Sequence, residues 1–126
     1  MDSRAKSQHH LLKSFSYALD GIKTAIMSER NMRIHLVSSA IVIGGSFYFS
    51  ITRLEWLIIL MAIGGVLALE LINTAIERLV DLVMEEYHPL AKQAKDMAAG
   101  AVILYAILSV VIGIVIFFPY LLKLLN

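Results

Sequence analysis

Four polar side chains recur at helical spacing inside a largely apolar stretch, residues 64–81. At about 100° per residue they fall within one stripe about 80° wide on a helix; they are Glu70, Asn73, Glu77 and Asp81. A long uncharged run precedes Glu70, and a carboxylate inside an apolar helix marks a functional site by default. Glu77 and Asp81 lie nearer the end of the stretch, where an ordinary solvated face explains them equally well.

The residue types in and around this stripe suit phosphoryl transfer. Carboxylate oxygens suit Mg²⁺, which proteins bind through one or two carboxylates together with substrate phosphates. A lysine stabilises charge on the transferred group, and a carboxylate in an apolar setting can accept a hydroxyl proton. These roles suggest transfer from ATP to a lipid alcohol, although no P-loop or protein-kinase glycine-rich loop is present. The candidate set is Glu29, Glu70, Asn73, Glu77, Lys95 and Asp96.

Composition predicts an all-α integral membrane protein. The chain has 126 residues, enough for one domain spanning 1–126, and 59% of them are hydrophobic with a mean hydropathy of +0.76. A soluble core of this size cannot bury so much apolar surface. Cysteine is absent, which excludes disulfides and cysteine-based sites. The N-terminal residues do not show a signal-peptide pattern.

The apolar pattern predicts one surface helix and three spanning helices. Residues ~11–28 are amphipathic, which suits a helix lying in the membrane interface or packed on its own protein. Spanning helices are expected at ~34–51, ~54–84 and ~97–122. In the first span, Gly44, Gly45 and Ser46 would allow another helix to approach closely, and His35 is expected to satisfy a helix end rather than bind a metal.

The second spanning helix is longer than a bilayer requires. Thr52 and Glu55 form a predicted capping box at its start, and about 34 residues correspond to ~50 Å against a hydrocarbon core of ~30 Å. Glu70 would then lie ~9 Å inside the far boundary and Glu77 at the boundary itself. The third helix is expected to start near Pro89, which suits a first turn, and to be interrupted late by Gly113 and Pro119.

Basic residues predict the orientation. Nine lysines and arginines lie in the N-terminal segment, at the end of the second span and in the 85–96 connection, against two on the other side. The excess places the N-terminus and the 85–96 connection in the cytoplasm, with the acidic end of the second helix at the same face. The two residues on the opposite side are Arg53 and Lys123.

The combined motif closely resembles the bacterial diacylglycerol kinase family of small integral membrane lipid kinases. The resemblance extends from about Phe15 to Pro119 and rests on 70–77 (ELINTAIE), Asp81, Tyr87-His88 and Ala94-Lys95-Asp96. Residues 29–31 (ERN), 88–92 (HPLAK) and 98–102 (AAGAV) are similar to the Gram-positive branch, which phosphorylates undecaprenol.

The resemblance implies a homotrimer in the bacterial cell membrane with sites between protomers, and an enzyme that uses ATP and Mg²⁺. Glu70 would be the catalytic base, with Asn73 orienting groups beside it, and Glu29 and Glu77 would hold Mg²⁺. The remaining nucleotide contacts implied by the family are Tyr17, Glu86, Tyr87, His88, Lys95 and Asp96. The family's N-terminal arginine is His10 here, so Lys13 becomes a second candidate for its role.

Three alternatives stay open at the level of sequence. Diacylglycerol is the alternative substrate to undecaprenol. A small transport protein would use Glu70 as an ion or proton site, but it would not require Glu29, Lys95 and Asp96 on the same side of the membrane. A structural subunit without activity leaves the acidic stripe unexplained, and a nucleic-acid partner is not expected.

Overall fold

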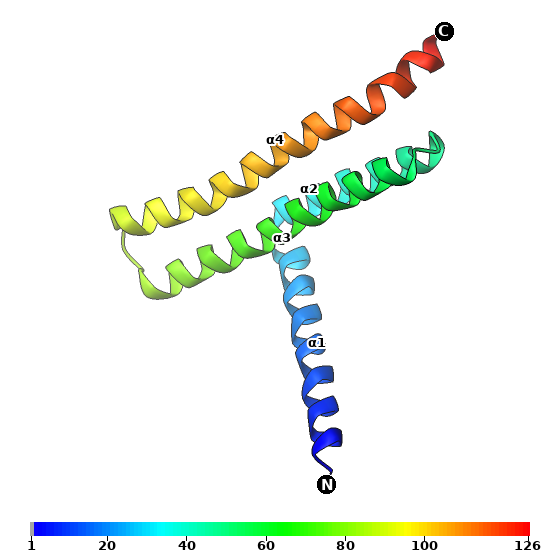
Figure 1. Cartoon of the computed structure of the whole chain (residues 1–126). Helices are drawn as coiled ribbons and strands as arrows, with labels where there is room; N and C mark the ends of the chain where they lie inside the picture. The colour runs from blue at the N-terminus through cyan, green and yellow to red at the C-terminus, as the bar shows by residue number, and fades with distance from the viewer. Residues whose placement is uncertain (1) are drawn as a thin grey trace.

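The computed structural model describes residues 2–126 as an all-helical chain, as the sequence predicts (Figure 1). Its helices are α1 (Ser3–Ser28), α2 (Arg30–Tyr48), α3 (Arg53–Val83) and α4 (Pro89–Leu125). The prediction that the first helix begins at Leu11 is wrong, because α1 already starts at Ser3. The polar residues before Leu11 include good helix formers but bury no face, so they leave no periodic signal in the sequence.

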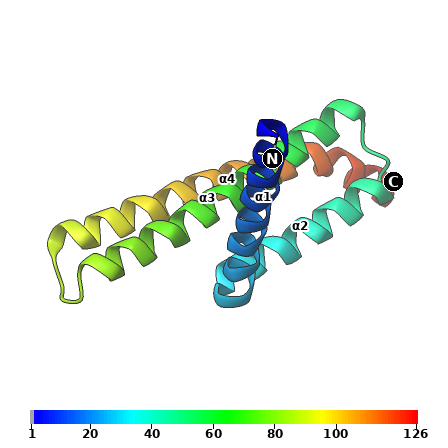
Figure 2. The ribbon, with the colours of Figure 1, turned by 90° about the horizontal axis from the view of Figure 1, so that it is seen from below.

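The helices form an antiparallel bundle with one projecting arm. α3 and α4 run side by side in opposite directions, and α2 returns along another face of α3 (Figures 1 and 2). α1 leaves the bundle at its junction with α2 and projects away from it (Figure 1). The turn between α2 and α3 therefore lies at the same end as the C-terminus, and the connection between α3 and α4 lies at the other end (Figure 1).

The turn between α2 and α3 depends on one residue in the left-handed backbone conformation. Ser50 has a φ of 50°, its N–H donates to the Phe47 carbonyl, and the Ile51 N–H donates to the Ser46 carbonyl. This is the Schellman arrangement, which satisfies carbonyls at a helix end. The helix therefore ends at Tyr48, earlier than the expected residue 51.

A polar contact ties the start of α3 to the end of α4. The predicted capping box is confirmed, with the Glu55 N–H donating to Thr52 Oγ1 and the Thr52 N–H donating to Glu55 Oε1. The Tyr120 hydroxyl donates to the same Glu55 oxygen at 2.6 Å. The rings of Phe117 and Tyr120 also pack against Phe49, so this end of the bundle is held by both polar and aromatic contacts.

The last helix starts where the sequence predicts but continues further. Pro89 occupies its first turn and the His88 side chain accepts from the Leu90 N–H. The expectation that Pro119 interrupts the helix is wrong, since α4 continues through it to Leu125. The proline removes one N–H from the ladder, and the aromatic packing around Tyr120 holds the last turns against the bundle.

Helices α3 and α4 approach each other closely at Gly65. A Cβ at Gly65 would meet the Tyr105 ring of α4, whose hydroxyl donates to the Met61 carbonyl at 3.2 Å. Within this single chain Gly44 faces open space, whereas a Cβ at Gly45 would contact the Phe117 ring of α4. Ser46 is the residue of that group that becomes fully buried.

Two of the described helices are apolar enough to cross a membrane. α3 and α4 meet that test by length and composition. Only 33% and 11% of their most apolar windows are buried within the chain, so most of this apolar surface is available to lipid or to other protomers. Within residues 2–126, α2 does not meet the test, because Arg30, Arg33 and His35 lower its hydropathy. The first predicted span therefore stays a prediction.

Candidate active site at the junction of α1, α2 and α3

Glu70 lies in the middle of the bundle, on the face of α3 that turns toward α2. It is 2% exposed although it carries a carboxylate. Its Oε2 lies 3.8 Å from Nε2 of His35, which projects from α2. Burial of a charge is costly without a compensating partner. The structure thus supplies Glu70 with an imidazole neighbour that the sequence analysis did not assign to it.

Asn73 and Glu77 continue the stripe toward the end of α3. Asn73 is 6% exposed, and its Nδ2 donates to Glu77 Oε1 at 3.3 Å. Within the described residues, Oδ1 of Asn73 and Oγ1 of the neighbouring Thr74 are buried without a hydrogen-bond partner. Glu77 is only partly buried. The predicted helical stripe is therefore confirmed for these residues, and its burial decreases from Glu70 outward.

Glu29 reaches the same region from the junction of two helices. It ends α1 and precedes the first residue of α2, with its N–H donating to the Ala25 carbonyl at 2.8 Å. Arg78 of α3 lies 3.6 Å from its carboxylate and donates to Ser28 Oγ at 2.5 Å. Arg33 of α2 donates to carbonyls at the end of α1. These contacts fix the bend that brings Glu29 against α3.

Three carboxylates thus share one site, each with a different partner. Glu29 pairs with Arg78, Glu77 accepts from Asn73, and Glu70 faces His35. We call Glu29, Glu70, Asn73 and Glu77 the junction cluster.

The junction cluster offers oxygen ligands suited to Mg²⁺. Within residues 2–126 the structure does not gather three or more metal-ligating side chains at one point. Mg²⁺ is commonly held by one or two carboxylates plus substrate phosphates rather than by a complete protein cage. Glu29 and Glu77 are both only partly buried, so phosphates could reach a metal ion at either carboxylate. The residues present therefore fit an ion that arrives with its nucleotide.

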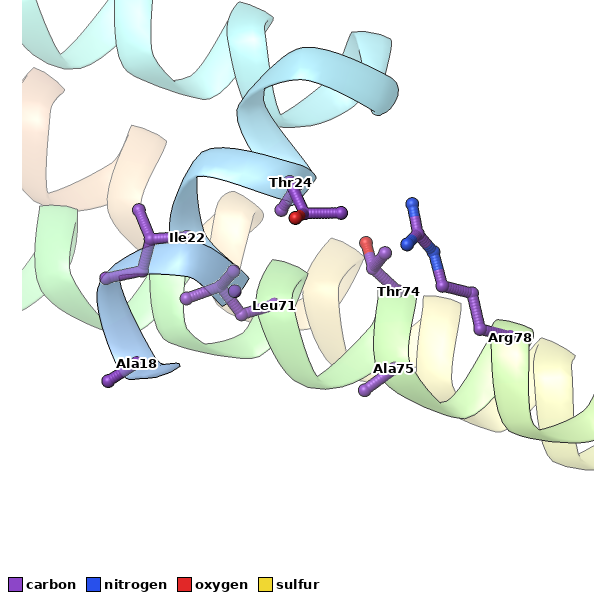
Figure 3. A pocket seen from close by; sticks show the side chains of 9 residues that line it. Ala18, Ile22, Thr24, Leu71, Thr74, Ala75 and Arg78 are labelled. Atoms are coloured by element: carbon purple, nitrogen blue, oxygen red, sulfur yellow. The ribbon is translucent and has the colours of Figure 1, made fainter. Parts of the chain in front are cut away.

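Two hollows border the junction cluster. A groove of about 360 Å³ opens between α2, α3 and α4, and its walls are mainly apolar with His35, Ser38 and Ser39 on the α2 side. A second hollow of about 380 Å³ lies between α1 and α3, where Thr24, Thr74 and Arg78 gather at one end (Figure 3). The first hollow suits an apolar chain, and the wall of the second includes the charged side chain of Arg78.

A second group of predicted residues lies at the connection between α3 and α4. Lys95 pairs with Asp81 across the two helices, and Asp96 pairs with Lys92 at 2.6 Å. Lys95 and Asp96 therefore form separate ion pairs with different partners. These residues line or border a hollow of about 420 Å³. We call Glu86, Tyr87, His88, Lys95 and Asp96 the hairpin group.

One chain does not bring all predicted site residues together. Asp81, which pairs with Lys95, is one helical turn beyond Glu77, about 6 Å along α3. Tyr17 is 69% exposed on α1, twelve residues or about 18 Å of helix before Glu29. The hairpin group thus lies beyond the junction cluster, past the end of α3, whereas Tyr17 is separate from both.

Comparisons with known proteins decide the family. The chain matches the family described as prokaryotic diacylglycerol kinase over residues 16–117. The chain belongs to this family. It is 44% identical to undecaprenol kinase of Bacillus subtilis over 94% of this chain and 98% of that protein. Diacylglycerol kinases of Synechocystis sp. and Haemophilus influenzae are 41% and 34% identical, covering 92% and 86% of this chain and 67% and 93% of those proteins.

The family predicted from the motif is thereby confirmed, and with it the lipid kinase class. In this prokaryotic diacylglycerol kinase family member, two further residues reach the junction cluster, and their contacts could not be predicted from the sequence. His35 gave no signal because its partner Glu70 is far away in the sequence. Arg78 follows Glu77 directly, yet its pairing with Glu29 depends on the bend between α1 and α2.

Proposed function

We propose that this chain is an ATP- and Mg²⁺-dependent lipid kinase that phosphorylates the hydroxyl group of undecaprenol. The observation that carries the proposal is the junction cluster: a buried Glu70 shares a face of α3 with the partly buried Glu77, and the partly buried Glu29 is held against α3 by Arg78. A lipid kinase needs a base at lipid depth and phosphate-binding groups toward the water. The identity of 44% to the Bacillus undecaprenol kinase supports this substrate.

In the proposed reaction, Glu70 takes the proton from the lipid hydroxyl as its oxygen attacks the γ-phosphorus. The bond from that phosphorus to the bridging oxygen of ATP breaks, and ADP leaves. Mg²⁺, held by Glu29 and Glu77 with the phosphates, would neutralise charge on the phosphoryl group. Asn73 orients the groups beside the base, because its amide already bonds Glu77 one turn away. No residue becomes covalently phosphorylated.

The hairpin group would complete the nucleotide site. Lys95 would contact the phosphates, while Asp96, Glu86, Tyr87 and His88 would line the nucleotide. Tyr17 joins this set only when supplied by another protomer or by a different placement of α1, because it is exposed and separate in the single chain. A homotrimer with sites between protomers supplies such contacts.

We place the enzyme in the bacterial cell membrane with three spanning helices, α2, α3 and α4, and with α1 at the cytoplasmic surface. The basic residues support this orientation. In this placement the junction cluster and the hairpin group face the cytoplasm, where ATP is available. The polar start of α2 then lies at the interface, where Arg30 and Arg33 can reach lipid headgroups.

Phosphate transfer from labelled ATP tests the proposal directly. Undecaprenol and diacylglycerol are supplied side by side in mixed micelles with Mg²⁺, and lipid phosphate is measured. Faster turnover on undecaprenol supports the proposed substrate. Faster turnover on diacylglycerol favours the second candidate, which the names of the Synechocystis and Haemophilus relatives support. Absence of product with both lipids would refute a lipid kinase.

A further inference from the structure

We propose that His35 is a positioning residue for Glu70, an inference that rests on the proposed kinase function. The imidazole Nε2 lies 3.8 Å from Oε2 of the carboxylate. This distance is longer than a hydrogen bond, and a closure of about 0.8 Å brings the two atoms into the normal range. Hydrogen bonds of catalytic groups are commonly long before substrate binds and tighten afterwards.

The surrounding charges single out His35 for this role. The other cations near the stripe are engaged elsewhere, since Arg78 contacts Glu29 and Lys95 contacts Asp81. Among the described residues, His35 is the basic side chain that lies within 4 Å of the Glu70 carboxylate. A buried carboxylate that accepts a defined donor keeps a defined orientation, because each oxygen is then distinguishable.

The position of His35 connects the carboxylate with the apolar groove. The His35 side chain is 23% exposed and that of Glu70 is 3% exposed. His35 lines the groove between α2, α3 and α4, together with Ser38, Val66 and Ser109. A lipid alcohol in that groove would therefore meet the imidazole beside the base. Once closure brings Nε2–H within hydrogen-bond range of Oε2, the other oxygen is left to receive the hydroxyl proton.

The role predicts a specific pattern among substitutions of His35. His35→Leu removes the donor, whereas His35→Gln retains an N–H near the position of Nε2. Misplacement of a catalytic group by about 1 Å can reduce a rate about 100-fold. We expect His35→Leu to lower kcat about 10- to 100-fold with little change in KM for ATP. His35→Gln should recover activity to within about 5-fold of the wild type.

The experiment measures kcat and KM with undecaprenol in mixed micelles for wild type, both His35 variants and His9→Leu. His9 lies exposed on α1, so the same substitution there should leave kcat unchanged. Thermal midpoints of all four proteins show whether they fold. Equal losses in His35→Leu and His35→Gln would overturn the positioning role, and so would a normal kcat in folded His35→Leu.

A second measurement does not depend on activity. A hydrophobic carbodiimide labels buried carboxyl groups, and mass spectrometry of peptides quantifies labelling at Glu70. His35→Leu replaces the polar neighbour of the carboxyl group with an apolar side chain in the wall of the groove. The hydrophobic reagent is favoured there, so Glu70 should label faster in His35→Leu than in wild type or His35→Gln. Unchanged labelling would overturn the inference. Failure of the wild-type protein to phosphorylate any lipid alcohol would instead count against the proposed function. The labelling result would still show whether His35 contacts Glu70.

Discussion

Replacing Glu70 and Glu77 separately by glutamine tests the division of roles within the junction cluster. Both changes preserve shape and remove one negative charge. Glu70 is 2% exposed and faces His35, whereas Glu77 is partly buried and accepts from Asn73. If Glu70 is the base, Glu70→Gln should lower kcat by about 10²- to 10⁴-fold, the range typical of general-base catalysis.

The distance between the two residues sets the expected effect on nucleotide binding. Seven residues separate them on α3, about 10 Å along the axis. A unit charge at about 10 Å contributes about 1.7 kcal/mol at an effective dielectric constant of about 20. The opposite charges of Mg²⁺ and ATP cancel part of this effect. We therefore expect the Kd of Mg·ATP to change by less than about 5-fold in Glu70→Gln.

Glu77→Gln should behave differently, because Glu77 would contact the metal directly. Loss of groups that only support a metal ligand already weakens binding about 10- to 100-fold, so we expect at least a 10-fold weaker Kd for Mg·ATP, or about 1.4 kcal/mol. Kd follows from calorimetry or from thermal stabilisation by Mg·ATP, and kcat from ADP release.

A matched control uses the same substitution at the other end of α3. Glu55→Gln weakens the capping box and the contact from Tyr120, so stability should fall while Kd and kcat per folded protein stay unchanged. Equal losses of nucleotide affinity in Glu70→Gln and Glu77→Gln would refute the division of roles. So would a normal kcat in Glu70→Gln.

Further predictions concern the rest of the bundle. Tyr120→Phe removes the hydroxyl that donates to Glu55 at 2.6 Å and should lower the thermal midpoint in detergent by a few degrees; an unchanged midpoint would contradict the importance of this contact. Ser50→Gly relieves a φ of 50° and should stabilise the protein by about 0.5–1 kcal/mol in denaturant titration, whereas destabilisation would show that the serine is favoured there. Lys95→Met should weaken Mg·ATP binding about 10-fold. Lys92→Met breaks only the pair with Asp96 and should weaken Mg·ATP binding less. A larger loss in Lys92→Met than in Lys95→Met would exclude Lys95 as the phosphate contact.

Local sequence signals predicted the ends of helices well where capping chemistry was explicit. Thr52 and Glu55 mark the start of α3, and Pro89 marks the first turn of α4. The prediction was less accurate where the signal was only apolar periodicity. Ser3 and Tyr48, the first residue of α1 and the last of α2, both differ from the expected limits. The polar start of α1 buries no face and therefore gives no periodic signal. The end of α2 is set by Ser50 in the left-handed conformation, which no strong sequence pattern marks.

The sequence by itself determined that Glu70, Asn73 and Glu77 share a face, because a helix repeats every 3.6 residues whatever surrounds it. It also carried the motif that identifies the family. Only the tertiary structure decided which residues neutralise and orient these carboxylates. The contacts of His35 with Glu70 and of Arg78 with Glu29 join residues 35 and 49 positions apart. Such contacts depend on how α1 bends into α2 and how α2 packs on α3, which no local pattern specifies.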